Sequence, residues 1–454
     1  MPYASLNPAT GQLLQLHDSW DDQRLQQSLE QAHRAQQDWA QTAPSARSKI
    51  LLKVALHLQE RRDEYAALIT QEMGKLLIEA RAEVEKCAAA CEYFAQHAEG
   101  FLRTETIASD AGKSYVEYRP LGVVFAIMPW NFPFWQAFRA AVPALMAGNA
   151  VVQKHAPNVP RCALAIEAAF RDCGLPEGVY INLMIEVEQA EQVIASHHVH
   201  AVTITGSEAA GRKVAALAGQ HLKKCVLELG GSDPFIVLHD ADLEYAVDMA
   251  VKSRFLNCGQ SCIAAKRFIV VPQIADEFLH RLKGRVEALR PGDPMDEAAT
   301  LAPMARHDLR ESLHSQIVDS IAQGAVAATG CEPVEREGYF YLPSILDHVT
   351  PATRAWHEEL FGPVAILIRA ADEDDALRIA NDNRYGLGSS IWSRDTERAE
   401  RLAERIRAGC TFVNGMVKSD PRLPFGGVKA SGYGRELSRL GMLEFVNAKT
   451  VWVR

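Results

Sequence analysis

The stretch Leu121-Gly122-Val123-Val124-Phe125-Ala126-Ile127-Met128 decides the fold, because it begins an alternation of apolar runs with helical segments. The later runs are short enough for strands, and the segments between them are amphipathic or rich in alanine. The runs are 150–153, 179–183 and 201–205, and the intervening segments include 136–147 and 160–173. This alternation predicts βαβ units that form a parallel sheet with helices on both faces.

The rest of the chain extends this α/β pattern. The first hundred residues have helical spacing at 21–39, 46–76 and 82–98, and 113–120 alternates as a half-exposed strand does. A second alternating region follows Glu228. Its expected strands are 234–238, 267–271, 361–368 and 411–413, its expected helices are 243–255, 274–289, 373–381 and 396–408, and 444–453 is expected to be extended. We therefore expect two interlocked α/β domains and a small strand-rich arm.

Composition and charge disfavour several kinds of partner and location. The chain has 454 residues and a formal net charge of -9, which disfavours nucleic acid and anionic membranes as partners. Residues 1–8 lack the features of a secretory signal, and the apolar runs are too short to cross a bilayer. The nine cysteines are odd in number and scattered. They favour reduced thiols and a cytoplasmic location.

Three side chains suggest covalent chemistry on a carbonyl. Cys262 follows the tight Gly259-Gln260 turn, where backbone amides are expected to lower the pKa of its thiol. Glu228 lies among apolar residues that would raise its pKa toward that of a general base. Asn131, held between two prolines, has an amide that can stabilise an oxyanion. Each has an ordinary alternative: a buried structural thiol, a solvent-facing or paired glutamate, and a turn asparagine.

The cofactor signal is weaker, since the chain has no Gly-x-Gly-x-x-Gly fingerprint. Thr205–Gly211 instead follows an expected strand and begins a helix, whose N-terminus can receive a phosphate. An ordinary helix cap explains the same pattern equally well. Lys154 ends another expected strand, where its ammonium can reach a ribose hydroxyl or a phosphate.

Six motifs in order resemble those of the aldehyde dehydrogenase superfamily, and the similarity runs from Asn7 to the C-terminus. They are Pro129–Pro133 (PWNFP), Thr205–Gly211 (TGSEAAG), Leu227–Gly231 (LELGG), Phe255–Cys262 (FLNCGQSC), Glu358–Pro363 (EELFGP) and Leu423–Gly432 (LPFGGVKASG). Other segments, including Lys154–Val159 and Met304–Arg310, resemble the bacterial succinate-semialdehyde branch that accepts NAD or NADP.

The resemblance implies roles for individual residues. Cys262 matches the nucleophile, Glu228 the base, and Asn131, with the backbone N–H of Cys262, the oxyanion hole. The matching cofactor-binding residues are Trp130, Lys154, Gly206, Ser207, Glu359 and Phe361. Arg139 matches a residue that binds the substrate carboxylate, and Ser419, which lies with Lys418 and Arg422 before the Pro-Phe-Gly-Gly turn, is a further candidate contact for it. The alternative for Arg139 is a surface arginine on an exposed helix face. The implied chemistry requires no metal.

Three departures bear on specificity. Glu208 stands where threonine is usual after Gly-Ser, and Pro157 stands where many NAD-preferring members have glutamate. Without that acid the 2′-phosphate of NADP is not repelled. NAD is still favoured, since no arginine cluster lies near Lys154 in the sequence. A second substrate arginine of some such enzymes would fall at Leu256, and its absence admits a broader range of aldehydes, such as glutarate semialdehyde and aliphatic or aromatic aldehydes.

The resemblance also implies a division of the chain. Residues 1–102 and 121–227 would form a Rossmann-type cofactor domain, 228–432 an α/β catalytic domain, and 103–120 with 433–454 an oligomerisation arm. That arm implies a homodimer or homotetramer.

Other readings of the same residues stay open. They are transfer of the acyl group to coenzyme A, a thiol esterase without redox chemistry, and a non-catalytic structural oligomer. The spacing of Cys258 and Cys262 also raises the hypothesis of an inactivating disulfide.

Overall fold

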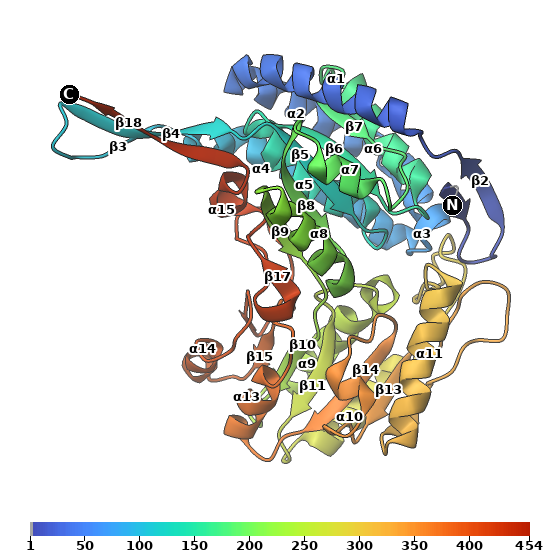
Figure 1. Ribbon diagram of the computed structural model, residues 1–454. Coiled ribbons are helices and arrows are strands. Elements are labelled where there is room, and N and C mark those ends of the chain that lie inside the picture. Colours follow the sequence, from blue (N-terminus) through green and yellow to red (C-terminus); the bar gives the residue numbers. More distant parts are fainter. Residues whose placement is uncertain (1–2) are drawn as a thin grey trace.

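The computed structural model describes residues 3–454 and contains two α/β lobes with an arm that projects from the first (Figure 1). The predicted α/β class is confirmed by two extended, mainly parallel sheets. Within residues 3–454, no helix is both long and apolar enough to span a bilayer.

The first lobe is built on a six-stranded sheet in the order β17-β9-β8-β5-β6-β7. All of its pairings are parallel except that of β17 with β9. The strands are β5 (Val123–Met128), β6 (Ala150–His155), β7 (Tyr180–Asn182), β8 (Val199–Thr205), β9 (Lys224–Glu228) and β17 (Gly432–Tyr433). The chain moves outward from β5 to β7 and then returns to the other side of β5 with β8. A switch of this kind leaves a crevice at the carboxyl ends of the strands.

Both faces of this sheet are covered, as the continuous apolar run of β5 predicts. Val124, Ala126 and Met128 belong to one hydrophobic core, and Val123 and Phe125 to another, because successive side chains of a strand point to opposite faces. The helices of this lobe are α1 (Asp22–Gln41), α2 (Pro44–Glu60), α3 (Arg62–Met73), α4 (Leu77–Phe101), α5 (Pro133–Met146), α6 (Pro160–Asp172), α7 (Ala190–Ala195) and α8 (Glu208–Gln220).

One expected helix of this lobe was wrong in its extent. The range 46–76 holds two helices, which separate at Arg61, where ψ is 21°. The second ends at Gly74, whose φ of 90° is in the left-handed region that glycine enters without strain. The break was missed because apolar positions continue at helical spacing across it.

The second lobe has a seven-stranded sheet in the order β12-β13-β14-β11-β10-β15-β16. Its strands are β10 (Asp233–Val237), β11 (Ala265–Val270), β12 (Val326–Thr329), β13 (Ser344–Asp347), β14 (Val364–Arg369), β15 (Ser390–Trp392) and β16 (Phe412–Val413). Its helices are α9 (Leu243–Phe255), α10 (Ala275–Glu287), α11 (His307–Ala322), α12 (Arg354–His357), α13 (Glu373–Asn381) and α14 (Thr396–Ala403). Two short 3-10 turns are η1 (Leu256–Gly259) and η2 (Lys429–Ser431).

Two features of this lobe differ from expectation. The helix expected at 396–408 ends at Ala403. Helix α11 was not expected, because it buries only Leu313, Ile317 and Ser320 and is otherwise polar.

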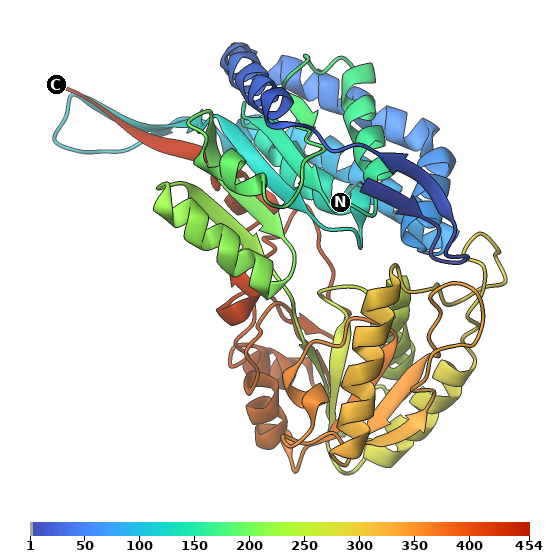
Figure 2. The same cartoon turned by 45° about the vertical axis from the view of Figure 1, so that its right-hand side comes forward.

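The arm is a three-stranded antiparallel sheet in the order β18-β4-β3. It combines β3 (Glu105–Thr106) and β4 (Lys113–Pro120) with β18 (Val446–Val453), which follows α15 (Ser438–Leu443). At the start of the described chain, β1 (Tyr3–Leu6) and β2 (Leu13–His17) form a separate antiparallel hairpin. Figure 2 shows the arm extending away from both lobes.

The order of the elements brings two sets of strand ends together. Trp130 and Ser207 follow the carboxyl ends of strands in the first sheet, and Lys154 lies near the carboxyl end of β6. Cys262 and Phe361 precede the amino ends of β11 and β14 in the second sheet. The catalytic candidates therefore lie where the two lobes meet.

We predict that Gly409→Ala destabilises the fold. A methyl group on Gly409 would overlap the carbonyl oxygen of Gly426, which is backbone and cannot turn away. Overpacking of this kind costs about 1–3 kcal/mol or more. Thermal unfolding followed by circular dichroism should show a midpoint lowered by a few degrees. The control is Gly219→Ala in α8, where nothing lies within 4 Å of the added methyl and alanine favours the helix. Equal midpoints for the two variants would contradict the prediction.

Candidate active site

The loop that carries Cys262 has an uncommon backbone. Asn257 and Cys258 have φ values of 55° and 54°, a left-handed conformation that non-glycine residues seldom adopt in succession. The N–H of Asn257 donates to the carboxylate of Glu79 on α4, at 3.1 Å from Oε1 and 3.2 Å from Oε2. Gly259 is also left-handed, and a side chain there would overlap the carbonyl oxygen of Gly362. These contacts hold the loop in a conformation that its own sequence does not favour.

Asn131 joins this loop to the first lobe. Its Nδ2 donates to the carbonyl oxygen of Gln260 at 3.0 Å, and its own carbonyl oxygen accepts from Nδ2 of Asn257 at 2.7 Å. A side-chain amide has two N–H donors, so one remains after the bond to Gln260. The alternative of an asparagine that satisfies only its own turn is wrong, because the partners lie in the other lobe.

Lys266 fixes the backbone of the cysteine itself. This buried lysine donates from Nζ to the carbonyl oxygens of Ser261 and Cys262 at 2.8 and 2.9 Å, and lies 3.2 Å from Oε1 of Glu359. The expectation that tight backbone lowers the pKa of Cys262 was wrong. Burial raises the pKa of this thiol to about 11, against the opposing effects of Arg139 and Lys266.

One cleft contains most of the predicted cofactor and catalytic residues. Its lining includes Trp130, Asn131, Gly206, Ser207, Cys262, Glu359 and Phe361. Trp130 meets Phe361 edge to face, with ring centroids 5.9 Å apart. Oε1 of Glu359 accepts from the N–H of Gly231 at 3.1 Å. Aromatic rings, a carboxylate and a helix N-terminus together fit a nucleotide that carries a nicotinamide and a pyrophosphate.

Ser207, at the start of α8, fits both interpretations of the Thr205–Gly211 motif, a helix cap and a phosphate site. Ser207 is an N-cap whose Oγ accepts from the N–H of Ala210 at 3.3 Å, and it also lines the cleft. Glu208 would repel a pyrophosphate at this position, but it pairs with Arg212 at 2.9 Å and with Arg384 of the second lobe. These partners offset its negative charge.

Lys154 lies outside this lining, at the end of β6. Burial lowers the pKa of its ammonium, and Glu186 and Glu188 oppose that shift. Its Nζ lies 5.7 Å from the centroid of the Tyr3 ring.

Glu228 is buried but does not line either cavity that contains Cys262. Within the described chain, its carboxylate oxygens have no hydrogen-bond partner. Burial raises the pKa of Glu228 well above its usual value, and the nearby Glu436 adds to the shift. A methyl group on Gly426 would lie 2.7 Å from Oε1, so the side chain points toward that glycine. In this orientation the carboxylate reaches neither of the two cavities.

Arg139 is a buried residue of α5, so the alternative of a surface arginine is wrong. Its guanidinium pairs with the buried Glu436 and donates to Oγ1 of Thr205 at 3.2 Å. It also lies over the ring of Phe425, 4.7 Å from the centroid. The positive charge of its guanidinium is therefore mostly balanced by groups inside the protein.

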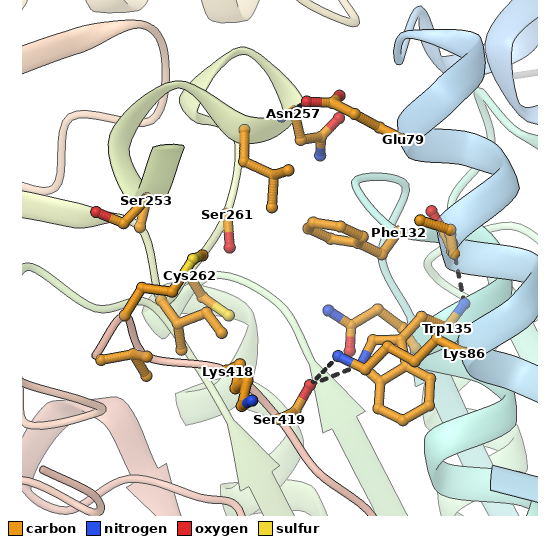
Figure 3. Close-up of a pocket in the computed structure, with 18 of the residues that line it drawn as sticks. Glu79, Lys86, Phe132, Trp135, Ser253, Asn257, Ser261, Cys262, Lys418 and Ser419 are labelled. Atoms are coloured by element: carbon orange, nitrogen blue, oxygen red, sulfur yellow. Dashed lines mark hydrogen bonds between the residues drawn. The ribbon is translucent and has the colours of Figure 1, made fainter. Parts of the chain in front are cut away.

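Cys262 also lines a second cavity, on the side of α4 and α5 (Figure 3). Ser419 lies in this wall, and its Oγ accepts from Nζ of Lys86 at 2.7 Å and from Nε1 of Trp135 at 3.1 Å. Arg139, Phe132 and Phe425 complete much of the lining. The structure thus brings together both predicted substrate residues.

Cys258 and Cys262 are both free thiols. Cys258 is part of the core of the second lobe, whereas Cys262 packs against the core of the first. The disulfide hypothesis remains a prediction that would require one thiol to leave its surroundings.

Comparison with known proteins identifies the family. A sequence model described as the aldehyde dehydrogenase family matches residues 1–451. The chain is 47% identical to a probable NADP(+) succinate-semialdehyde dehydrogenase of Synechocystis sp., with all of both chains covered. It is 47% identical to the NAD(P)+ succinate semialdehyde dehydrogenase of Escherichia coli K12, over 99% of this chain and 97% of that one.

A solved structure agrees. Succinic semialdehyde dehydrogenase from Streptococcus pyogenes in complex with NADP+ superposes with a TM-score of 0.98 at 39% identity, covering 99% of each chain. The protein belongs to the aldehyde dehydrogenase family. Its fold is that of the solved structure over nearly the whole chain.

Several residues of the site were not found from the sequence. Glu79, Lys86 and Glu436 lie on helices or loops far along the chain from Cys262 and carry no local motif. Lys266 did leave a signal in the sequence. It lies four residues after the cysteine and within an apolar strand, where a buried lysine is unusual.

We predict that alkylation of Cys262 in the ligand-free protein depends steeply on pH. Since the pKa of the thiol is about 11, the thiolate fraction should rise about tenfold per pH unit between pH 7 and 9. Iodoacetamide modification followed by peptide mass spectrometry measures the rate at this residue, and Cys262→Ala identifies the peptide. A rate that is flat across this range would indicate a pKa near or below 7.

We also predict that Arg139→Ala destabilises the protein, because it leaves the buried Glu436 without its cation, so that the carboxyl must stay charged and unpaired or take up a proton. Breaking a buried pair costs about 3–5 kcal/mol, whereas replacing both partners by uncharged groups is often nearly neutral. Thermal unfolding should therefore show a larger loss for Arg139→Ala than for the double variant Arg139→Met/Glu436→Gln. The opposite order would contradict the pairing.

Proposed function

We propose that the protein oxidises succinate semialdehyde to succinate, with NADP or NAD as the oxidant and Cys262 as the nucleophile. One observation carries the proposal. Cys262 lines two cavities, one with the residues suited to a nicotinamide nucleotide and the other mainly apolar, with Lys86, Arg139 and Ser419 in its wall as groups suited to a carboxylate. A cysteine in this position can contact an aldehyde carbon and present it to a cofactor on the opposite side.

In the first half-reaction the thiol of Cys262 gives its proton to solvent, and the resulting thiolate sulfur adds to the aldehyde carbon. The free N–H of the Asn131 amide and the backbone N–H of Cys262 donate to the oxygen that becomes negative. Lys266 keeps the cysteine backbone in place during this step. A nicotinamide held by Trp130, Glu359 and Phe361 would supply the hydride acceptor for this oxidation. The product on the enzyme is a thioester of Cys262.

The second half-reaction releases the acid. Glu228, after rotating away from Gly426, removes a proton from water as that water attacks the thioester. In its buried position the raised pKa keeps the carboxyl of Glu228 in its neutral form, so the same rotation must also let it ionise before it acts as the base. The base argues for hydrolysis over transfer to coenzyme A, and the nucleotide cleft argues against an esterase without redox chemistry.

The substrate proposal rests on the relatives and on the second cavity. The relatives described above are named for succinate semialdehyde, and Ser419 and Arg139 are our proposed contacts for the carboxylate end. Arg139 would act mainly through its field, since Glu436 holds its guanidinium. Leu256, which also lines this cavity, adds no second arginine, so other aldehydes remain the alternative substrates.

For the cofactor, we propose that Trp130, Gly206, Ser207, Glu359 and Phe361 contact it along the cleft and that Lys154 reaches its ribose. The names of the relatives include NADP and NAD(P), which supports the use of both nucleotides. The corresponding division is a cofactor domain of 1–102 and 121–227 and a catalytic domain of 228–432.

We further propose a cytoplasmic homodimer or homotetramer formed through residues 103–120 and 433–454. The arm extends beyond both lobes, and Trp452 and Val453 at its tip are exposed. All nine cysteines are free, in keeping with a reducing compartment.

The test is the initial rate of NADPH and NADH formation with succinate semialdehyde, glutarate semialdehyde, butanal and benzaldehyde. Wild type should prefer succinate semialdehyde, and Cys262→Ala should lose activity. Glu228→Gln should release about one reduced cofactor per site and then turn over about 10²–10⁴-fold more slowly, as expected for loss of a general base. Equal rates with uncharged aldehydes would reject the substrate, and undiminished turnover in Cys262→Ala would reject the mechanism.

A further inference from the structure

Lys86 is a cation in the wall of the substrate cavity that the motifs do not single out. It lies on α4, half-buried, with its Nζ 4.3 Å from the centroid of the Trp135 ring. Its hydrogen bond to Oγ of Ser419 directs the ammonium to the same point as the indole N–H of Trp135. Figure 3 shows both donors meeting Ser419 at one side of the cavity, with Cys262 across from them.

The neighbouring acids do not neutralise this lysine, because each has another partner. Glu83 pairs with Lys75, Glu436 pairs with Arg139, and Asp420 pairs with Arg422 at 2.6 Å. Glu79 accepts from the backbone of the cysteine loop. Within residues 3–454, Lys86 makes no ion pair with a carboxylate. A cation that is partly removed from water and lacks a counter-ion is suited to an incoming anion.

The surroundings of Lys86 disfavour its charged form. Burial, with help from Arg139, lowers the pKa of Lys86 to about 8, while Glu83, Asp420 and the thiol of Cys87 oppose the shift. The ammonium is therefore destabilised in the empty cavity. A bound carboxylate would restore its charge and gain a charge-assisted hydrogen bond in return.

We propose that Lys86 binds the carboxylate of the substrate directly, with Ser419 and Trp135 as neighbouring donors, and thereby selects ω-carboxylated aldehydes over uncharged ones. The inference rests on the proposed function and names the group that recognises the substrate. Lys86 is then the direct ionic contact for the substrate carboxylate. Arg139, whose guanidinium is held by Glu436, contributes through its electrostatic field.

The pH dependence has a definite sign. Below about pH 8 Lys86 is protonated and attracts the carboxylate, and above that pH the attraction is lost. The ratio of kcat/KM for succinate semialdehyde to kcat/KM for butanal removes the ionisation of Cys262 and Glu228, which changes both rates together. Glu79 and Lys418 line the same cavity, and burial raises the pKa of Glu79 to about 7, so its ionisation lowers the ratio mainly below pH 8. The decline above pH 8 is the part assigned to Lys86. The ratio should fall as pH rises from 7 to 9.5.

The experiment measures this ratio in wild type, Lys86→Met, Lys86→Arg and the control Lys53→Met. The control makes the same change at an exposed lysine on α2. Lys86→Met should lower the ratio about 10- to 100-fold, mainly through KM for succinate semialdehyde, as expected for one charge-assisted hydrogen bond. It should keep its butanal activity and lose the decline of the ratio above pH 8, while the change near pH 7 from Glu79 remains. Lys86→Arg should restore much of the ratio and remove its decline above pH 8, and Lys53→Met should match wild type.

The possible failures are distinguishable. A wild type that prefers succinate semialdehyde, with the same ratio in Lys86→Met, would overturn the role of Lys86 and leave the proposed function standing. Equal losses with both aldehydes in Lys86→Met would assign the lysine a structural role and also overturn the inference. A wild type without any preference would overturn the proposed substrate, and the role of Lys86 with it.

Discussion

The hydrogen bond from Nδ2 of Asn131 to the carbonyl oxygen of Gln260 joins the two lobes at the point where the chemistry is expected. Asn131 follows β5 of the first sheet, and Gln260 lies two residues before Cys262 in the second lobe. The bond positions the amide beside the cysteine and also supports a loop with two left-handed non-glycine residues. Strain of about 1–3 kcal/mol per residue persists only where neighbouring contacts determine the conformation. Here Glu79, Asn131 and the missing side chain of Gly259 supply those contacts.

Buried charge organises the rest of the site. Lys75 pairs with Glu83, Arg139 with Glu436, and Lys266 with Glu359, so the cations around Cys262 are mostly compensated. Glu228 differs, since within residues 3–454 its buried carboxylate oxygens have no hydrogen-bond partner. An unpaired carboxyl in the interior favours its neutral form and must move or meet water before it ionises. The other charges named here are therefore paired, whereas the carboxyl of Glu228 is not.

Sequence patterns predicted the scaffold well where the period was strong. Leu243–Phe255 and Glu373–Asn381 are helices with the expected bounds, and Lys113–Pro120 is the expected strand. Errors occurred where local signal and tertiary packing diverge, as in the break at Arg61 and the polar helix α11. The pKa of Cys262 was also misjudged, because a Gly-Gln turn suggests nearby amides but does not reveal how far the sulfur is removed from water.

By itself, the sequence determined the alternation of strands and helices, the order of the motifs, and the identity of the cysteine, the glutamate and the asparagine of the candidate site. These follow from short-range periodicity and from residue types that suit one chemistry. Only the tertiary structure decided which charges are paired and which cavity each side chain faces. Arg139 meets Glu436, and Lys86 meets Ser419, across most of the length of the chain. Electrostatic pairing depends on distance in space and on burial, and neither is encoded by spacing along the sequence.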